Sequence, residues 1–247
     1  MRRLELIFVL TAFCLRVGVS AQEVPKEITD PIELLRKASD AVKAEVIQYN
    51  TTVQPFGYPL PRSPRMEGTV LMSGWRKDGP AKFKYDITFV YGEASGGEQI
   101  TIGSDGETYY LLEHGKKKVH EGRDHSVFGA YTGAMRSFPV VELVKRPPLE
   151  NELVSGTVEL QGSTRVGNED CREIKITYRG RQGTEALWYF SKKTFLLRRV
   201  DIATQKSSEV REGRQVMLAD MVLNPKFDSD PFNLQIPPGY EKVQPAP

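Results

Sequence analysis

The sequence predicts an α+β fold that is mainly β, with one sheet of roughly eight to eleven mostly antiparallel strands. Two observations carry this prediction. Apolar and polar residues alternate with period 2 in many segments, and short turns rich in Gly and Asp separate these segments. A helix before the strands and a helical insert between two groups of strands are expected to cover one face of the sheet.

The composition is typical of a globular protein. Of the 247 residues, 39% are hydrophobic and 27% are charged, which excludes a disordered chain and a protein with several membrane spans. The formal net charge of +2 comes entirely from the first 21 residues, which hold three arginines and one glutamate. Because the rest of the chain is balanced in charge, we expect no nucleic acid partner.

The N-terminal segment has the three parts of a secretory signal peptide. Met1-Arg2-Arg3 is positively charged, Leu6–Leu15 is apolar, and Val19-Ser20-Ala21 supplies small residues for cleavage. We therefore expect the first 21 residues to be removed before Gln22. The mature chain, residues 22–247, is then expected to form a single domain in the periplasm.

The two cysteines do not predict a disulfide. Lipid attachment at Cys14 is an alternative to simple cleavage, but the bulky Phe13 before it disfavours that reaction. The ten-residue apolar run is also too short for a membrane anchor, which needs roughly 20 residues. Cys171 is alone in the mature chain, and alternation places it opposite Ile174 of the strand Arg172–Tyr178. This position favours a packed or edge cysteine over a nucleophile.

A helix is expected over Asp30–Ile47. Asp30 can cap its first turn, the proline that follows suits the first helical position, and apolar residues recur at helical spacing from Leu34 to Val46. The four prolines after this helix predict a loop over Tyr49–Pro64.

Strands dominate the rest of the chain. The segment Lys82–Tyr91 alternates over ten residues, which predicts a strand with one buried and one solvated face. Asp105-Gly106 predicts a tight hairpin. The other strands are expected at Gly68–Trp75, Glu98–Gly103, Thr108–Glu113, Lys116–His120, Ser155–Gln161, Cys171–Tyr178, Ala186–Phe190, Leu196–Ile202 and Gln215–Val222.

One segment interrupts the β pattern. Ser126–Arg146 is rich in apolar residues without alternation and predicts one or two short helices, the second beginning at Pro139. Pro147-Pro148 is expected to close this helical insert, which reaches to about Lys145.

No catalytic or cofactor motif is present in the sequence. It lacks G-x-S-x-G, a Walker loop, G-x-G-x-x-G, H-E-x-x-H and C-x-x-C, so we expect neither an enzyme nor a cofactor. His114, His120 and His125 lie close in sequence, but their spacings do not share one helix face and four cations lie among them. This pattern favours solvated hairpin residues over a metal site.

The few helices predict incomplete filling of the sheet's inner face. A curled sheet that is not filled by its own side chains leaves an apolar cavity, which favours a lipid ligand. The candidate cavity residues are aromatic or aliphatic residues of two strands: Phe83, Tyr85, Ile87, Phe89, Tyr91 and Trp188.

Four short motifs stand out in the strand-rich part of the chain: Ser104–Tyr110 with a Lys-rich hairpin after it, Gly167–Cys171, Leu187–Arg199 and Phe232–Tyr240. Together they resemble the outer-membrane lipoprotein carrier (LolA-like) superfamily, and among its members the predicted periplasmic proteins of unknown function. The resemblance spans Asp30–Val243. It implies a single antiparallel sheet curled into an unclosed half-barrel, lidded by an N-terminal helix and a short helical insert. It also implies an interior that accepts acyl chains, and no catalytic residues.

Three functions stay open at this point. The favoured one is a non-catalytic, monomeric periplasmic carrier whose partner is a lipid or an acylated protein. The second is an envelope sensor or scaffold of the same fold that contacts a membrane-associated protein. The third is a hydrolase, for which the sequence offers no nucleophile and base pair.

Overall fold

The computed structural model describes residues 28–57, 64–75, 81–92, 97–154, 156–179, 183–206 and 210–243. The expected signal peptide, its cleavage site before Gln22 and Cys14 lie outside the described residues. None of the helices in the described ranges is both long and apolar enough to cross a membrane.

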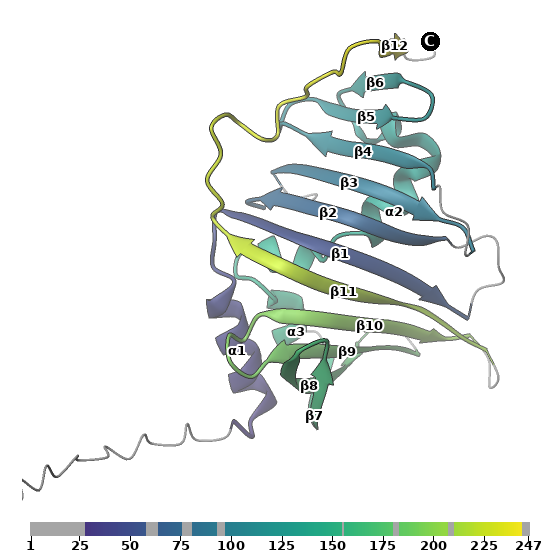
Figure 1. Cartoon of the computed structure of the whole chain (residues 1–247). Coiled ribbons are helices and arrows are strands. Elements are labelled where there is room, and N and C mark those ends of the chain that lie inside the picture. Colours follow the sequence, from purple (N-terminus) through teal and green to yellow (C-terminus); the bar gives the residue numbers. More distant parts are fainter. Residues whose placement is uncertain are drawn as a thin grey trace, which may run out of the picture.

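One sheet of twelve strands forms the frame of the described chain (Figure 1). Its spatial order is β12-β6-β5-β4-β3-β2-β1-β11-β10-β9-β8-β7. The strands are β1 (Val46–Phe56), β2 (Arg65–Ser73), β3 (Lys82–Val90), β4 (Gln99–Ser104), β5 (Tyr109–Glu113), β6 (Lys118–Gly122), β7 (Gly156–Val166), β8 (Glu169–Tyr178), β9 (Thr184–Ser191), β10 (Leu197–Gln205), β11 (Arg211–Leu223) and β12 (Glu241–Val243). This confirms the single, mostly antiparallel sheet and exceeds the expected strand number by one.

The strand order divides the sheet into two meanders. Strands β1 to β6 follow one another in space, strands β7 to β11 do the same, and the two groups meet where β1 pairs antiparallel with β11. β12 adds to β6 as a parallel strand. The two outermost strands, β7 and β12, are not paired with each other, so the described sheet is open.

The expected helix over Asp30–Ile47 is too long. Helix α1 spans Pro31–Ala41, with the Asp30 side chain accepting a hydrogen bond from the Ile32 N–H over 2.9 Å as its N-cap. Val42 ends the helix, and Val46 already belongs to β1. Apolar residues continue after Ala41, but from Val46 on they are buried at alternate positions, as in a strand, and no longer at helical spacing.

The expected loop over Tyr49–Pro64 is wrong for its first half, which is the central strand β1. Alternate side chains of this strand are buried: Ile47, Tyr49, Thr51 and Val53. β1 pairs with β2 on one side and β11 on the other, and these two ladders outweigh the proline at position 55, near its end. Pro55 therefore lies near the end of a strand, and Pro59 and Pro61 lie outside the described residues.

The helical insert is longer and more divided than the sequence predicts. It consists of η1 (His125–Tyr131), α2 (Thr132–Ser137), η2 (Val141–Val144) and α3 (Glu150–Val154). The last of these follows Pro147-Pro148, where the insert was expected to end. Figure 1 shows α2 and α3 behind the sheet and α1 beside its lower strands. The helices thus cover one face, as expected.

The insert packs tightly on the inner face of the sheet. Phe83 of β3 lies with its ring centroid 6.3 Å from that of Phe128, and the Tyr85 ring lies 6.5 Å from that of Phe138. The Val140 N–H donates to the Tyr49 hydroxyl over 2.8 Å, so this buried phenol of β1 is satisfied. The middle of the inner face is therefore solid core.

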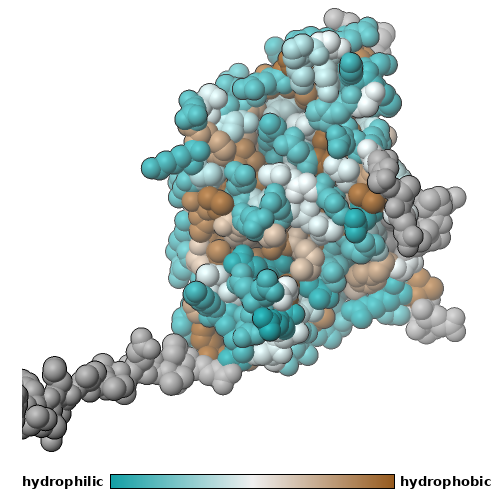
Figure 2. Space-filling model, in the orientation of Figure 1, coloured by the Kyte–Doolittle hydropathy of each residue, from teal (hydrophilic) through white to brown (hydrophobic). Residues whose placement is uncertain are grey.

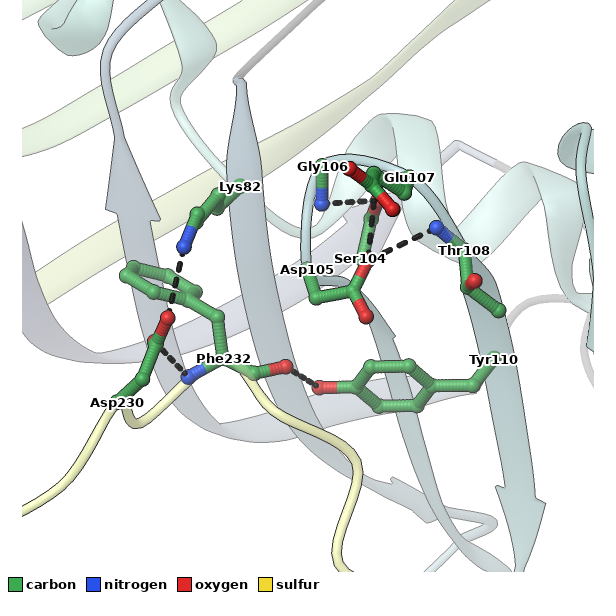
Figure 3. A network of polar contacts seen from close by, with 9 residues as sticks. All are labelled: Lys82, Ser104, Asp105, Gly106, Glu107, Thr108, Tyr110, Asp230 and Phe232. Atoms are coloured by element: carbon green, nitrogen blue, oxygen red, sulfur yellow. Dashed lines mark hydrogen bonds and ion pairs between the residues drawn. The ribbon is translucent and has the colours of Figure 1, made fainter.

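The opposite, outer face is mostly hydrophilic (Figure 2). The C-terminal segment after β11 runs past the left-hand ends of the upper strands and reaches β6, with which β12 pairs (Figure 1). Polar contacts hold this segment to the sheet (Figure 3): Lys82 Nζ lies 2.7 Å from Asp230 Oδ2, and the Tyr110 hydroxyl donates to the Phe232 carbonyl over 3.1 Å. Tyr110, Leu112 and Val119 form a small apolar cluster against it.

The motif Ser104–Tyr110 forms the hairpin turn between β4 and β5 (Figure 3). Asp105 Oδ1 accepts hydrogen bonds from the Glu107 N–H over 2.9 Å and the Thr108 N–H over 2.8 Å. The Ser104 hydroxyl accepts from the Gly106 N–H, and Gly106 has φ +102°. The motif is therefore explained by turn geometry.

Candidate functional site

A cavity of about 620 Å³ remains on the inner face, beside α2 and the end of β3. Its volume lies within the range of about 300–1,000 Å³ that is typical of small-molecule sites. We call it the insert cavity. Its apolar walls are Val53, Met66, Phe89, Tyr91, Ala130 and Ala134. Gly133 of α2 also lines it and leaves room above its backbone, because a Cβ added there meets no atom within 4 Å.

The candidate cavity residues of β3 divide into two groups. Phe89 and Tyr91 line the insert cavity, and Tyr91 is 48% exposed at its mouth. Phe83, Tyr85 and Ile87 are at most 3% exposed and belong to the packed core. The insert makes this difference, since its phenylalanines pack against Phe83 and Tyr85 but do not reach the end of the strand.

Trp188, the remaining candidate, lies on β9 and lines a second cavity of about 320 Å³. We call this the polar cavity, because Glu142, Glu152, Tyr178 and Arg214 also line it. The insert cavity and the polar cavity share Ile202 and Arg214 as walls. The two cavities therefore adjoin along β10 and β11.

Glu152 is the most buried acid of the polar cavity, with 2% of its surface exposed. Its Oε1 accepts a hydrogen bond from the Tyr178 hydroxyl over 3.3 Å. Burial, and next the negative charge of Glu142, raise the pKa of Glu152 from 4.5 to about 7. At neutral pH this carboxyl group is therefore divided between its protonated and ionised forms.

Tyr131 ties the insert to the sheet at the edge of the insert cavity. Its hydroxyl donates to Glu98 and, over 3.1 Å, to Glu113 Oε1 of β5. Burial alone would raise the pKa of Glu113, but hydrogen bonds from Lys116, His120 and Tyr131 outweigh it and lower the pKa to about 2. Glu113 is therefore a fully ionised acceptor at neutral pH.

Glu152, Tyr131 and Glu113 were not among the residues singled out in the sequence. Glu152 follows the two prolines that were expected to end the insert, and only the packing of α3 against the sheet buries it. Tyr131 contacts Glu113 through tertiary structure, since the two residues lie in different elements 18 positions apart. Helical or alternating periodicity describes single elements, so it predicts neither this contact nor the burial of Glu152.

The three histidines lie apart and are part of hydrogen-bonded or aromatic contacts, so they are not simply solvated. His114 contacts Thr101 Oγ1 at 2.9 Å and the Tyr240 hydroxyl at 2.6 Å, and His120 contacts Glu113 Oε2 at 2.9 Å. His125 packs edge-on against the Tyr109 ring. In the described ranges, no three His, Cys, Asp or Glu side chains converge in a metal-binding group.

Cys171 is fully buried on the outer face, where it packs with Val166 and Tyr189. Burial raises the pKa of its thiol. A buried thiol with a raised pKa is a poor nucleophile, which agrees with the expected packed cysteine.

No family model and no curated protein matches the sequence. Among solved structures, LprF from Mycobacterium bovis aligns with a TM-score of 0.51 and 11% identity, over 82% of this chain and 97% of LprF. The chain shares the LprF fold. This likeness concerns the path of the backbone only, because so few residues are identical.

Two further solved structures match with lower scores. The Mycobacterium tuberculosis lipoprotein LppX aligns with a TM-score of 0.47 and 11% identity, over 79% of this chain and 96% of LppX. The LolA superfamily protein NE2245 from Nitrosomonas europaea aligns with a TM-score of 0.34 and 13% identity, over 84% of this chain and 99% of that protein. A LolA superfamily protein is therefore among the solved structures that this chain matches.

Proposed function

We propose that the protein is a non-catalytic binding protein that holds the acyl chain of a lipid or of an acylated protein in the insert cavity. The observation that carries this proposal is the cavity itself, which is open to solvent at Tyr91 and has apolar side chains of three strands and of α2 in its walls, beside the charged side chains of Glu98, Glu212 and Arg214. Each methylene group of a chain buried there contributes about 0.8 kcal/mol to binding.

The proposal includes export to the periplasm, which rests on the order of charged, apolar and small residues before Gln22. Sequencing the N-terminus of the protein purified from its own cells tests this part. A mature chain that begins at Gln22 supports it, and an intact Met1 rejects it.

Gly133 is the position chosen to block the insert cavity, because it lines the cavity and a Cβ added there meets no atom within 4 Å. We expect Gly133→Phe to place its ring in the cavity, since the position is helical and the space beside it is open. The variant should fold as the wild type does and lose displacement of a fluorescent fatty-acid probe. Binding by the wild type together with loss in this variant supports the proposal.

The matched control is Gly115→Phe. Gly115 also faces open space, but it lies in the turn between β5 and β6, away from the insert cavity. This variant should bind the probe as tightly as the wild type. A wild type without probe binding, or a Gly133→Phe variant that binds equally well, rejects the acyl-binding function.

A protein contact is a second candidate, and the edge strand β7 favours it. β7 has 11 residues and pairs only with β8 in the part of the chain that the structure describes. An open edge of this length can accept a strand of a membrane-associated protein. Amide hydrogen exchange along β7, with and without detergent-solubilised envelope membranes, tests this. Slower exchange confined to β7 supports a strand contact, and unchanged exchange rejects it.

A further inference from the structure

Large apolar side chains are exposed beside the mouth of the insert cavity. Tyr91 follows β3, Phe56 ends β1 and Val210 directly precedes β11, and each is more than one third exposed. Strands β3, β2, β1 and β11 are neighbours in the sheet, so the three side chains lie at one end of four adjacent strands. Figure 1 shows these strand ends together on the right-hand side. We call the three residues the mouth patch.

The strand register places the mouth patch next to the cavity. Phe56 is the partner of Gly213 in β11, and its ring lies against this glycine, where an added Cβ would come within 2.5 Å of the Phe56 Cζ. Gly213 also lines the insert cavity, as Tyr91 does. Since neighbouring strands lie about 4.8 Å apart, the patch spans roughly 15 Å from β3 to β11. The cavity therefore opens within an apolar surface.

Basic side chains lie among the members of the patch. Arg65 begins β2, Arg211 begins β11 and Lys206 follows β10, and all three are exposed. Arg65 forms an ion pair with Glu67. Arg211 forms one with Glu185 over 3.6 Å. Ion pairs that are this exposed contribute little stability, so the guanidinium groups can turn to the anionic groups of a partner.

This combination of side chains fits the surface of a phospholipid bilayer. Aromatic and aliphatic side chains enter the interfacial region of a bilayer, while the long side chains of arginine and lysine reach its phosphate groups. A bilayer is also a source of acyl chains. Each methylene group that meets water between the bilayer and the cavity adds to the cost of transfer, and a mouth that touches the bilayer avoids this cost.

We infer that the mouth patch docks on the surface of a phospholipid bilayer, and that an acyl chain passes there between the bilayer and the insert cavity. This inference builds on the proposed acyl-binding function and adds the surface from which the ligand comes. The apolar side chains supply the contact, and the basic side chains favour anionic lipids.

Co-sedimentation with vesicles of phosphatidylethanolamine and phosphatidylglycerol measures the docking. Val210→Ser should weaken vesicle binding roughly 3- to 10-fold, because a half-exposed apolar side chain no longer leaves water on docking. Phe56→Ser should weaken it at least as much. Among the described residues, the wall of the insert cavity includes neither of the two. Both variants should therefore bind the fluorescent fatty-acid probe in vesicle-free solution as the wild type does.

Val222→Ser is the matched control. Val210 and Val222 lie at opposite ends of β11 and are 43% and 46% exposed, so the two substitutions remove the same apolar group from similarly exposed positions. Val222→Ser should bind vesicles as tightly as the wild type. Equal weakening by Val210→Ser and Val222→Ser would overturn the inference, because binding would then not depend on the mouth.

The kinetics of transfer give a second readout. Transfer of the probe from the protein to vesicles should become faster in proportion to the vesicle concentration, because its rate depends on encounters between the mouth patch and the bilayer. Val210→Ser should slow this transfer, and Val222→Ser should not. A rate that does not depend on the vesicle concentration would show that the chain leaves through water, which contradicts the inference.

The outcomes separate this inference from the proposed function. Probe binding without vesicle binding by the wild type rejects docking and leaves acyl binding intact. Vesicle binding that all three serine variants retain has the same meaning. Vesicle binding that Val210→Ser weakens, in a protein that does not bind the probe, supports the docking surface and rejects acyl binding.

Discussion

The hydroxyl of Tyr131 donates a hydrogen bond to Glu113 Oε1 over 3.1 Å and thereby ties the helical insert to β5. Tyr131 also lines the insert cavity, next to Phe89, whose ring centroid lies 5.9 Å from its own. One side chain thus holds the insert in place and forms part of the cavity wall. A change in this attachment of the insert would therefore also alter the cavity wall.

Removal of this hydroxyl should loosen the insert. We expect Tyr131→Phe to lower the free energy of unfolding by about 1–2 kcal/mol, because two carboxylates lose a hydrogen-bond donor. Urea unfolding measures this change. Tyr91→Phe is the control, since Tyr91 lines the same cavity but is half exposed. Equal stability of the two variants would show that the Tyr131 contacts do not hold the insert.

Glu152 should make stability depend on pH. Its pKa in the folded state is raised from 4.5 to about 7, so the folded protein holds this proton more tightly than the unfolded chain. The resulting stabilisation is complete below pH 4.5 and is lost as the pH rises to about 7. Glu152→Gln, which cannot ionise, should therefore gain about 3 kcal/mol relative to the wild type between pH 4.5 and pH 8.

Urea unfolding at both pH values checks this prediction. The exposed Glu150 offers the control, because Glu150→Gln should follow the wild type at each pH. A constant difference between Glu152→Gln and the wild type over this range would mean that the buried carboxyl group keeps an ordinary pKa.

Two phenylalanines of β3 distinguish core from cavity wall. Phe83 packs on Tyr85, Tyr109 and Phe128, so Phe83→Ala should lower the free energy of unfolding by about 3–5 kcal/mol. Phe89 borders the insert cavity, where the Tyr131 ring centroid lies 5.9 Å from its own and open space lies beside both rings. Phe89→Ala therefore loses fewer contacts and should lower the free energy of unfolding by only about 1–2 kcal/mol. Denaturant melts of both variants measure the costs, and similar costs would show that the cavity is filled by protein.

The C-terminal segment is expected to depend on Tyr110. In Tyr110→Phe the Phe232 carbonyl loses its donor, and stability should fall by about 1 kcal/mol. Amide exchange around Phe232 should become faster as the segment detaches from the outer face. Tyr109→Phe is the matched control, because the ring of this neighbouring residue packs inward on Phe128. Unchanged exchange in Tyr110→Phe would exclude this anchoring role.

Local sequence patterns predicted β3 and the Asp105 hairpin correctly, because alternation and turn chemistry act between neighbouring residues. They did not predict β1. Its identity as a strand depends on β11, whose Val216 lies opposite Val53 although the two residues are far apart in the chain. The prolines near Phe56 are a local signal, and the distant ladder outweighs it.

The candidate site was predicted in the same uneven way. Alternation places Phe83 and Phe89 on one face, but it cannot tell which part of that face the insert fills. The difference between core and cavity wall depends on where Phe128 and Phe138 of the insert pack against β3. Likewise, Glu152 belongs to a five-residue helix whose burial comes only from its tertiary packing.

The junction of β1 and β11 has a consequence for synthesis and export. β1 is synthesised first among the strands, but its neighbour β11 is synthesised only after every other strand except β12. Until then, β1 is an edge strand with unpaired backbone groups, and it carries residues that are buried in the complete fold, such as Tyr49. A chain that stops before Arg211 would hold two half-sheets with no hydrogen-bonded ladder between them, so the single sheet is completed only when its last long strand is made.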